Sequence, residues 1–189
     1  MCMVLTPKDL VRIAGFSVVS GVVFAIWSHL IAPIAFALGG HVGIGAVYGM
    51  WFIGGTLVGY IVRKPTAAFL GEAIGSIVEL LLISPYSILL YYYGPAQGIM
   101  SEIAFALGKY KRWDLPIMVL AGVLPVIAAY PFDVFVSPFY PQARFYPFSL
   151  HVTIVSAMVV SGALLAGVLV KLIVDFATKA GAIKVGEAS

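Results

Sequence analysis

Charged residues are scarce in this chain, and their scarcity excludes a soluble globular protein. Only 10% of the 189 residues are charged and 62% are hydrophobic, with a mean hydropathy of +1.07. The apolar residues form successive runs of roughly twenty, which is the length that crosses a hydrocarbon core as a helix. A membrane β-barrel would show short alternating segments instead. The sequence therefore predicts an all-α integral membrane protein.

The chain also has only one cysteine and lacks the common catalytic motifs. The single cysteine, Cys2, excludes an internal disulfide and a cysteine metal cluster. The chain has no phosphate loop of the GxxxxGK type, no HExxH and no GxSxG. We therefore expect no enzyme activity, no bound metal and no cofactor, and any ATPase that drives transport must be another chain. No basic patch interleaved with aromatics lies outside the loops, so we expect no nucleic-acid partner.

The apolar runs predict a single transmembrane domain over residues 1–189, built as a bundle of six helices. The predicted spans are roughly 9–34, 43–62, 66–84, 94–108, 115–134 and 149–175. The first run opens without a small-residue cleavage site, which favours a mature helix over a signal peptide. Ten of the eleven Lys and Arg residues fall in the loops of one side, and only Arg144 falls on the other. By the positive-inside rule, both termini face the cytoplasm of a prokaryotic cell, and lipid surrounds the bundle.

Four carboxyl residues are candidates for chemistry at membrane depth, where an ionisable group is expensive and faces a cavity or a partner by default. They are Glu72, Glu79, Glu102 and Asp133. Glu72 and Glu79 are seven residues apart and share a helix face. No Lys or Arg lies in the middle of the bundle to pair with the acids. The acids are therefore protonated, hydrogen-bonded to neighbours, or matched to a ligand that brings donors or positive charge.

Depth along each span separates these acids. A rise of ~1.5 Å per residue places Glu79 and Gln97 at a similar level in the outer part of the bundle. The same count places Glu102 near the midplane and Glu72 nearer the cytoplasm. We therefore expect an outer pocket that contains Glu79, Gln97 and Glu102. Glu72 either contacts the ligand or serves packing or the coupling interface, and Asp133 either contacts the ligand or holds the outer loop.

Aromatic residues gather at the same outer level. Tyr48 and Trp51 are three apart and share one helix face, either as core packing or as ring faces for a cation or a heterocycle. The outer loops are rich in Gly, Pro and aromatic residues, Tyr92 among them. They form an interfacial aromatic belt, a lid over an external cavity, or both.

Small residues recur on one face of the first span. Ser17, Gly21 and Ala25 follow at intervals of four, a spacing that lets another helix approach closely. The approaching helix belongs either to this bundle or to a partner protein.

Several segments together resemble the YkoE family, the thiamine or hydroxymethylpyrimidine-binding membrane subunits of energy-coupling-factor transporters. They are VYGMWFI followed by RKP, GEAIGSIVELLL, AQGIMSEIAF, FDVFVS and SGALLAGVL, within residues 45–170. The resemblance implies a six-helix bundle that binds its vitamin near the extracellular side. It also implies two kinds of partner, a transmembrane coupling subunit and a pair of cytoplasmic ATPases. The face formed by Ser17, Gly21 and Ala25 would then dock the coupling subunit.

An aminopyrimidine offers donors to acids and amides, and a thiazolium ring brings positive charge to a cavity without bases. Our hypothesis assigns the polar edge of the ligand to Glu79, Gln97 and Glu102. Tyr48, Trp51 and an outer-loop tyrosine such as Tyr92 would then cover the ring faces. Two alternatives remain at this level: a binding subunit for another small cationic vitamin, and a self-sufficient proton-coupled carrier with Glu72 and Glu79 as a relay.

Overall fold

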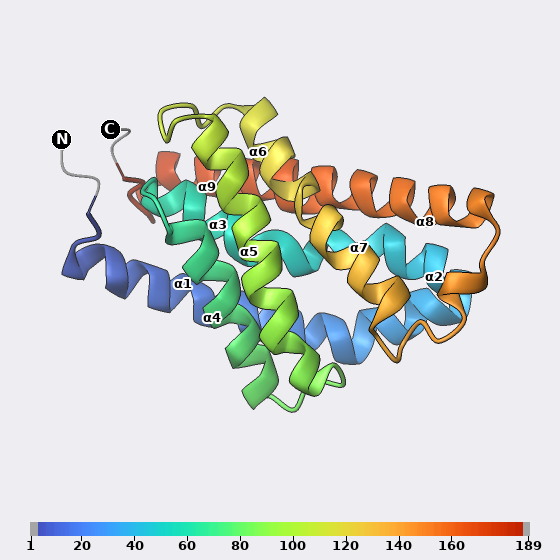
Figure 1. Ribbon diagram of the computed structural model, residues 1–189. Coiled ribbons are helices and arrows are strands. Elements are labelled where there is room, and N and C mark those ends of the chain that lie inside the picture. The colour runs from blue at the N-terminus through green and yellow to red at the C-terminus, as the bar shows by residue number, and fades with distance from the viewer. Residues whose placement is uncertain (1–3, 187–189) are drawn as a thin grey trace.

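The computed structural model describes residues 4–186, and every regular element in that range is helical (Figure 1). Cys2 lies outside the described residues. The α-helices are α1 (Pro7–Ile26), α2 (Ala32–Val47), α3 (Ile53–Val62), α4 (Ala67–Leu81), α5 (Leu90–Leu107), α6 (Leu115–Val123), α7 (Pro125–Phe135), α8 (Phe148–Ser161) and α9 (Val170–Lys179). Short π and 3-10 segments interrupt them: η1 (Trp27–Ile31), η2 (Tyr48–Phe52), η3 (Ser87–Leu89), η4 (Ala143–Phe145) and η5 (Gly162–Leu169).

Three helical stretches within residues 4–186 are long and apolar enough to cross a membrane. They are Pro7–Val62, Leu115–Phe135 and Phe148–Lys179. The first stretch reverses direction at Gly39 and Gly40, where Gly40 adopts a φ of +56° that a side chain would disfavour. A Cβ on Gly43 would lie only 2.1 Å from the carbonyl oxygen of Ala35, so the two arms touch just beyond the turn.

Local signals in the sequence explain where several helices begin. Thr6 caps α1 in a capping box with Asp9, and Pro7 occupies the first turn, where its missing N–H costs nothing. Asp114 caps α6, and its side chain accepts a hydrogen bond from the backbone N–H of Ile117. Such caps satisfy backbone donors that the helix itself leaves free.

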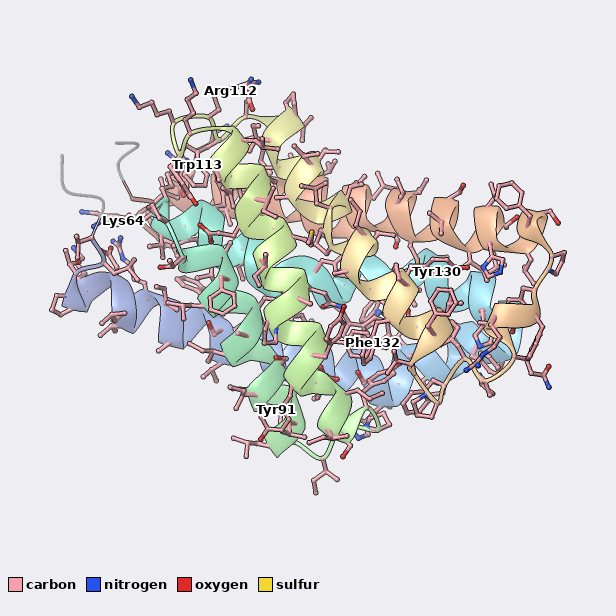
Figure 2. All side chains as sticks on the ribbon, viewed as in Figure 1. Lys64, Tyr91, Arg112, Trp113, Tyr130 and Phe132 are labelled. Carbon is pink, nitrogen blue, oxygen red and sulfur yellow. The ribbon has the colours of Figure 1, made fainter. Side chains whose placement is uncertain are left out.

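One end of the described chain meets the loop between α3 and α4 and the other meets the last turn of α3, which identifies one end of the bundle. Lys64 donates to the carbonyl oxygen of Val4 at 3.2 Å and pairs with Asp9 at 2.7 Å. The backbone N–H of Gly186 donates to the carbonyl oxygen of Ile61 at 2.7 Å. We call this the basic end, and Figure 2 shows Lys64 there together with Arg112 and Trp113. In that figure Tyr91, Tyr130 and Phe132 lie away from it, toward what we call the aromatic end.

The small-residue face of α1 packs against α4 of the same chain. Ser17, Gly21 and Ala25 are buried, and a Cβ on Gly21 would lie 2.5 Å from the carbonyl oxygen of Gly75. Of the two alternatives left open by the sequence, the structure favours a helix of the same bundle over a coupling subunit. The interval of four indicates a close helix contact, and α4 supplies it in this chain.

Candidate ligand-binding cavity

A small cavity lies in the half of the bundle toward the aromatic end, where α1, η2, α4, α5 and α7 meet. Its wall is formed by Phe24, Tyr48, Trp51, Glu72, Ser76, Glu79, Tyr86, Leu90, Tyr93, Gly94, Gln97, Asp133 and Tyr140. We call it the inner cavity. Three of these residues carry carboxyl groups and one an amide, six are aromatic, and no lysine or arginine is among them. With the wall side chains in these positions the space measures about 30 Å³, which is room for a water molecule or two, so an organic ring would enter only after part of the wall moved.

Glu79 stands at the centre of a hydrogen-bond chain that joins three segments. Its Oε1 accepts from the hydroxyl of Ser28 at 2.6 Å and from the hydroxyl of Ser84 at 2.8 Å. The indole N–H of Trp51 donates to the Ser28 hydroxyl at 3.0 Å. Ser28 lies in the π-helical segment η1, a kind of irregularity that is frequent at functional sites. One oxygen of Glu79 therefore holds the wall together, and the other is not used by these bonds.

Glu72 lies two turns below Glu79 on the same face of α4 and is also fully buried, with 1% of its surface exposed. Its Oε2 accepts from the backbone N–H of Gly55 at 2.6 Å, in the first turn of α3. A helix start carries partial positive charge, so a carboxylate is favoured there. Gly54 makes this approach possible, because a Cβ on it would lie 2.9 Å from Glu72 Oε2. Glu72 thus belongs to the cavity and not only to the packing below it.

Asp133 fixes two of the aromatic side chains. The hydroxyl of Tyr48 donates to Asp133 Oδ2 at 2.9 Å, and the hydroxyl of Tyr93 donates to Oδ1. Asp133 is 1% exposed, and both of its oxygens are used by tyrosines that themselves line the cavity. Asp133, near the end of α7, therefore holds two rings of the aromatic wall in place.

Gln97 differs from the acids because its amide makes no hydrogen bond with any of residues 4–186. The side chain is 4% exposed and lines the inner cavity. No fully inaccessible side-chain nitrogen or oxygen in the described range lacks a partner. The Gln97 amide therefore faces the cavity space, where it offers both donors and an acceptor.

Glu102 lies outside the inner cavity, although the sequence suggested a pocket position near the midplane. Its two oxygens accept from the backbone N–H groups of Thr66, Ala68 and Phe69 at 2.8 to 3.1 Å and from the Tyr110 hydroxyl at 2.8 Å. Thr66 precedes α4 at the basic end, so Glu102 serves as the cap of that helix. The predicted depth of Glu102 was wrong because α5 begins at Leu90, four residues before the expected position 94. Glu102 therefore lies about one turn further along the helix toward the basic end.

The tyrosine in the cavity wall is Tyr93 and not Tyr92. Tyr92 is 41% exposed, stacks on Phe132 with ring centroids 3.9 Å apart, and does not line the cavity. Tyr93 precedes Gln97 by four residues, a spacing that puts both on one helix face and that would have distinguished it from Tyr92. Tyr86 and Tyr140, which come from loops, carry no such periodic signal.

The inner cavity brings together six of the eight residues predicted to bind the ligand, and their ligand contacts stay a prediction. The six are Glu72, Glu79, Gln97, Asp133, Tyr48 and Trp51. Within residues 4–186, no group of three or more His, Cys, Asp or Glu side chains is arranged to hold a metal ion. What the arrangement offers is a set of acceptors and ring faces for a flat molecule that brings its own donors or positive charge.

Known proteins are similar to this chain in both sequence and fold. The family described as "ABC-type cobalt transport system, permease component" matches residues 8–128. A relative from Bacillus subtilis (strain 168), "Putative HMP/thiamine permease protein YkoE", is 34% identical over 168 residues, which cover 89% of this chain and 82% of the relative. A solved structure, "Crystal structure of an S-component of ECF transporter", has a TM-score of 0.86 and 30% identity, covering 94% of this chain and 88% of the other.

The solved S component of an ECF transporter shares the fold of this chain at 30% identity, and this fold defines the chain as a membrane component of such a transporter. The chain is therefore a multi-pass protein of the prokaryotic cell membrane and not an enzyme. More specifically, the chain belongs to the YkoE family of energy-coupling-factor transporter S components.

Proposed function

We propose that this chain captures thiamine or its hydroxymethylpyrimidine precursor on the extracellular side for ATP-driven uptake. The observation that carries the proposal is the composition of the inner cavity, with three carboxyl groups, one amide and six aromatic rings but no lysine or arginine. The name of the Bacillus subtilis relative, which mentions HMP and thiamine, supports the same ligand class.

The chemistry of the ligand matches the groups that the wall leaves free. An aminopyrimidine ring brings an exocyclic amine that donates and ring nitrogens that accept. Gln97 offers the complementary donors and acceptor, and Glu79 offers an oxygen that Ser28 and Ser84 do not use. The faces of Tyr48, Trp51 and other wall rings suit a flat heterocycle and, for intact thiamine, the positive charge of its thiazolium ring.

The proposed topology is six spans with both termini in the cytoplasm. In this arrangement the spans are the two arms of Pro7–Val62, then α4, α5, Leu115–Phe135 and Phe148–Lys179. The basic end gathers Lys64, Arg112 and both ends of the described chain, and basic loops face the cytoplasm. The inner cavity lies toward the opposite end, which the proposal assigns to the extracellular half.

The proposed partners are a transmembrane coupling subunit and two cytoplasmic ATPases, because an S component supplies only the binding function of an energy-coupling-factor transporter. Membership in this family favours the modular transporter over a self-sufficient proton-coupled carrier. Because α4 covers Ser17, Gly21 and Ala25, the coupling subunit would dock on another face.

Uptake of labelled thiamine tests the proposal in a bacterial strain that lacks its own thiamine uptake. We expect accumulation only when the chain is produced together with a coupling subunit and ATPases, and we expect loss of accumulation when the ATPases carry an inactivating substitution. The matched control is the Q97L variant, produced with the same partners. We expect it to accumulate less thiamine, because the substitution removes the free amide without breaking a bond in the wall. Accumulation without partners that a protonophore abolishes would contradict the proposal and indicate a carrier.

A further inference from the structure

A second, larger cavity adjoins the inner cavity at the aromatic end. It measures about 250 Å³ and is lined chiefly by apolar and aromatic side chains, among them Phe36, His41, Pro85 and Phe139. We call it the outer chamber. Tyr86 and Tyr140 line both cavities, so these two rings form the partition between them.

The two partition residues are held very differently. Tyr140 is 6% exposed and stacks on His41 with ring centroids 4.2 Å apart. His41 is in turn hydrogen-bonded to the hydroxyl of Tyr146 and to the carbonyl oxygen of Phe139. Neither tyrosine hydroxyl makes a hydrogen bond with any of residues 4–186, but the ring of Tyr86 makes only edge contacts with other rings, those of Trp51, Tyr93 and Phe139. Tyr86 is therefore the less firmly held of the two partition residues.

The loop that carries Tyr86 is fastened at two points near its start. A ring nitrogen of His29 lies 3.2 Å from the carbonyl oxygen of Ile83, and Ser84 donates to Glu79. Ile83 has a φ of +60°, a conformation that a β-branched residue rarely adopts and that persists only where its surroundings hold it. His29 lines neither cavity, and its other ring nitrogen lies 2.8 Å from the carbonyl oxygen of Ala25 one turn earlier, so the ring connects the loop to its own helix.

Space and charge indicate which way a ligand passes. The inner cavity is too small for an organic ring as it stands, whereas the outer chamber is large enough for one. No lysine or arginine lines the chamber, so no such side chain repels a cationic ring there.

We propose that the outer chamber is a first binding site for a flat aromatic or cationic ring and that Tyr86 is the gate through which this ring enters the inner cavity. Opening requires movement of the loop that starts at Ile83, and His29 restrains that movement. Because Ser84 donates to Oε1 of Glu79, this fastening connects the loop to the wall of the inner cavity. The identity of the ligand rests on the proposed function, but the gate itself does not.

Thiol labelling tests the gate without any vitamin. In a Cys2→Ser background, Ser76→Cys places the sole thiol in the inner-cavity wall, where Ser76 bonds only to the carbonyl oxygen of Ala73 in its own helix. The probe is trimethylammonium-ethyl methanethiosulfonate, a small cation. We expect slow modification with Tyr86 present and severalfold faster modification in Y86A. H29A should accelerate it as well, although neither cavity loses a wall residue.

Two matched variants complete the test. Y92A removes the neighbouring tyrosine that lines neither cavity, and H151A removes a histidine bonded to Tyr130 instead of to the loop. Both should leave the labelling rate unchanged. Fast labelling with Tyr86 intact, no acceleration in Y86A and H29A, or equal acceleration in Y92A would overturn the gate. Acceleration in Y86A and H29A, without protection of the H29A variant by saturating thiamine, would support the gate but reject the vitamin.

Discussion

Replacing Glu102 by glutamine is expected to destabilise the fold while leaving ligand affinity unchanged. Oε1 accepts from the Thr66 N–H and the Tyr110 hydroxyl, and Oε2 accepts from the N–H groups of Ala68 and Phe69. In glutamine one of the two oxygens becomes an NH₂ group, so two of these four donors lose their acceptor. At a net ~0.5–1.5 kcal/mol for each bond, the variant should lose about 1–3 kcal/mol of unfolding free energy.

The matched comparison is Glu79→Gln. A glutamine carbonyl can still accept from both Ser28 and Ser84, so stability should change by less than about 1 kcal/mol. The amide nitrogen then replaces the oxygen that the proposed ligand would use, and a charge-assisted bond of ~1.5–3 kcal/mol is lost. This corresponds to about a tenfold to 150-fold rise in the Kd for thiamine.

Both variants can be compared in detergent by denaturant titration and by calorimetric binding of thiamine. We expect E102Q to lose stability but keep its affinity for thiamine, and E79Q to lose affinity but keep its stability. A fall in affinity in E102Q as large as that in E79Q, without loss of stability, would refute the assignment of Glu102 as a helix cap.

The other predictions concern the cavity wall and the contact between α1 and α4. D133N should weaken thiamine binding and destabilise the fold by about 1–3 kcal/mol, because one of the hydroxyls of Tyr48 and Tyr93 loses its acceptor; wild-type stability and affinity would refute this. Q97L should lower affinity in calorimetry without lowering the unfolding free energy, since the amide makes no bond within the described residues. G21A should cost about 1–3 kcal/mol in denaturant titration because its Cβ would clash with Gly75 and Val78, whereas G15A, which meets nothing within 4 Å, should be neutral or stabilising.

The cavity residues were largely predictable because the cost of burying ionisable groups in a membrane is a strong constraint. Glu72, Glu79 and Asp133 have no basic residue beside them in the bundle, and that fact alone directs attention to a shared cavity. Spacing then connects Glu72 with Glu79 and Tyr48 with Trp51. Helix periodicity, which can be read from the sequence, is enough to place each of these pairs on one helix face.

The misplaced residues depend on where α5 begins. Gly94 and Pro95 suggest a helix start, since proline is favoured in a first turn. Pro95 instead lies inside α5, which starts at Leu90. The difference moves Glu102 toward the basic end and turns Tyr92 away from the cavity. Proline lacks a backbone N–H, and a helix can accommodate a proline about one turn after its first residue. The position of Pro95 therefore does not by itself locate the first residue of α5.

The small-residue face of α1 shows a different kind of limit. A spacing of four among Ser17, Gly21 and Ala25 specifies that a helix approaches closely, but it contains no information about which chain supplies that helix. Only the three-dimensional position of Gly75 on α4 decides the question. The same holds for Tyr86 and Tyr140, which reach the cavity from loops whose paths no periodic pattern describes.

The most direct test of the central claim is quantitative mass spectrometry of the small molecules that remain bound to the chain after purification from cells grown with thiamine. We expect thiamine or its pyrimidine precursor in near-stoichiometric amount in the wild type, and a marked loss of it in E79Q and Q97L but not in E102Q. Absence of both compounds, or equal retention in all four proteins, would contradict the claim that the inner cavity binds this vitamin.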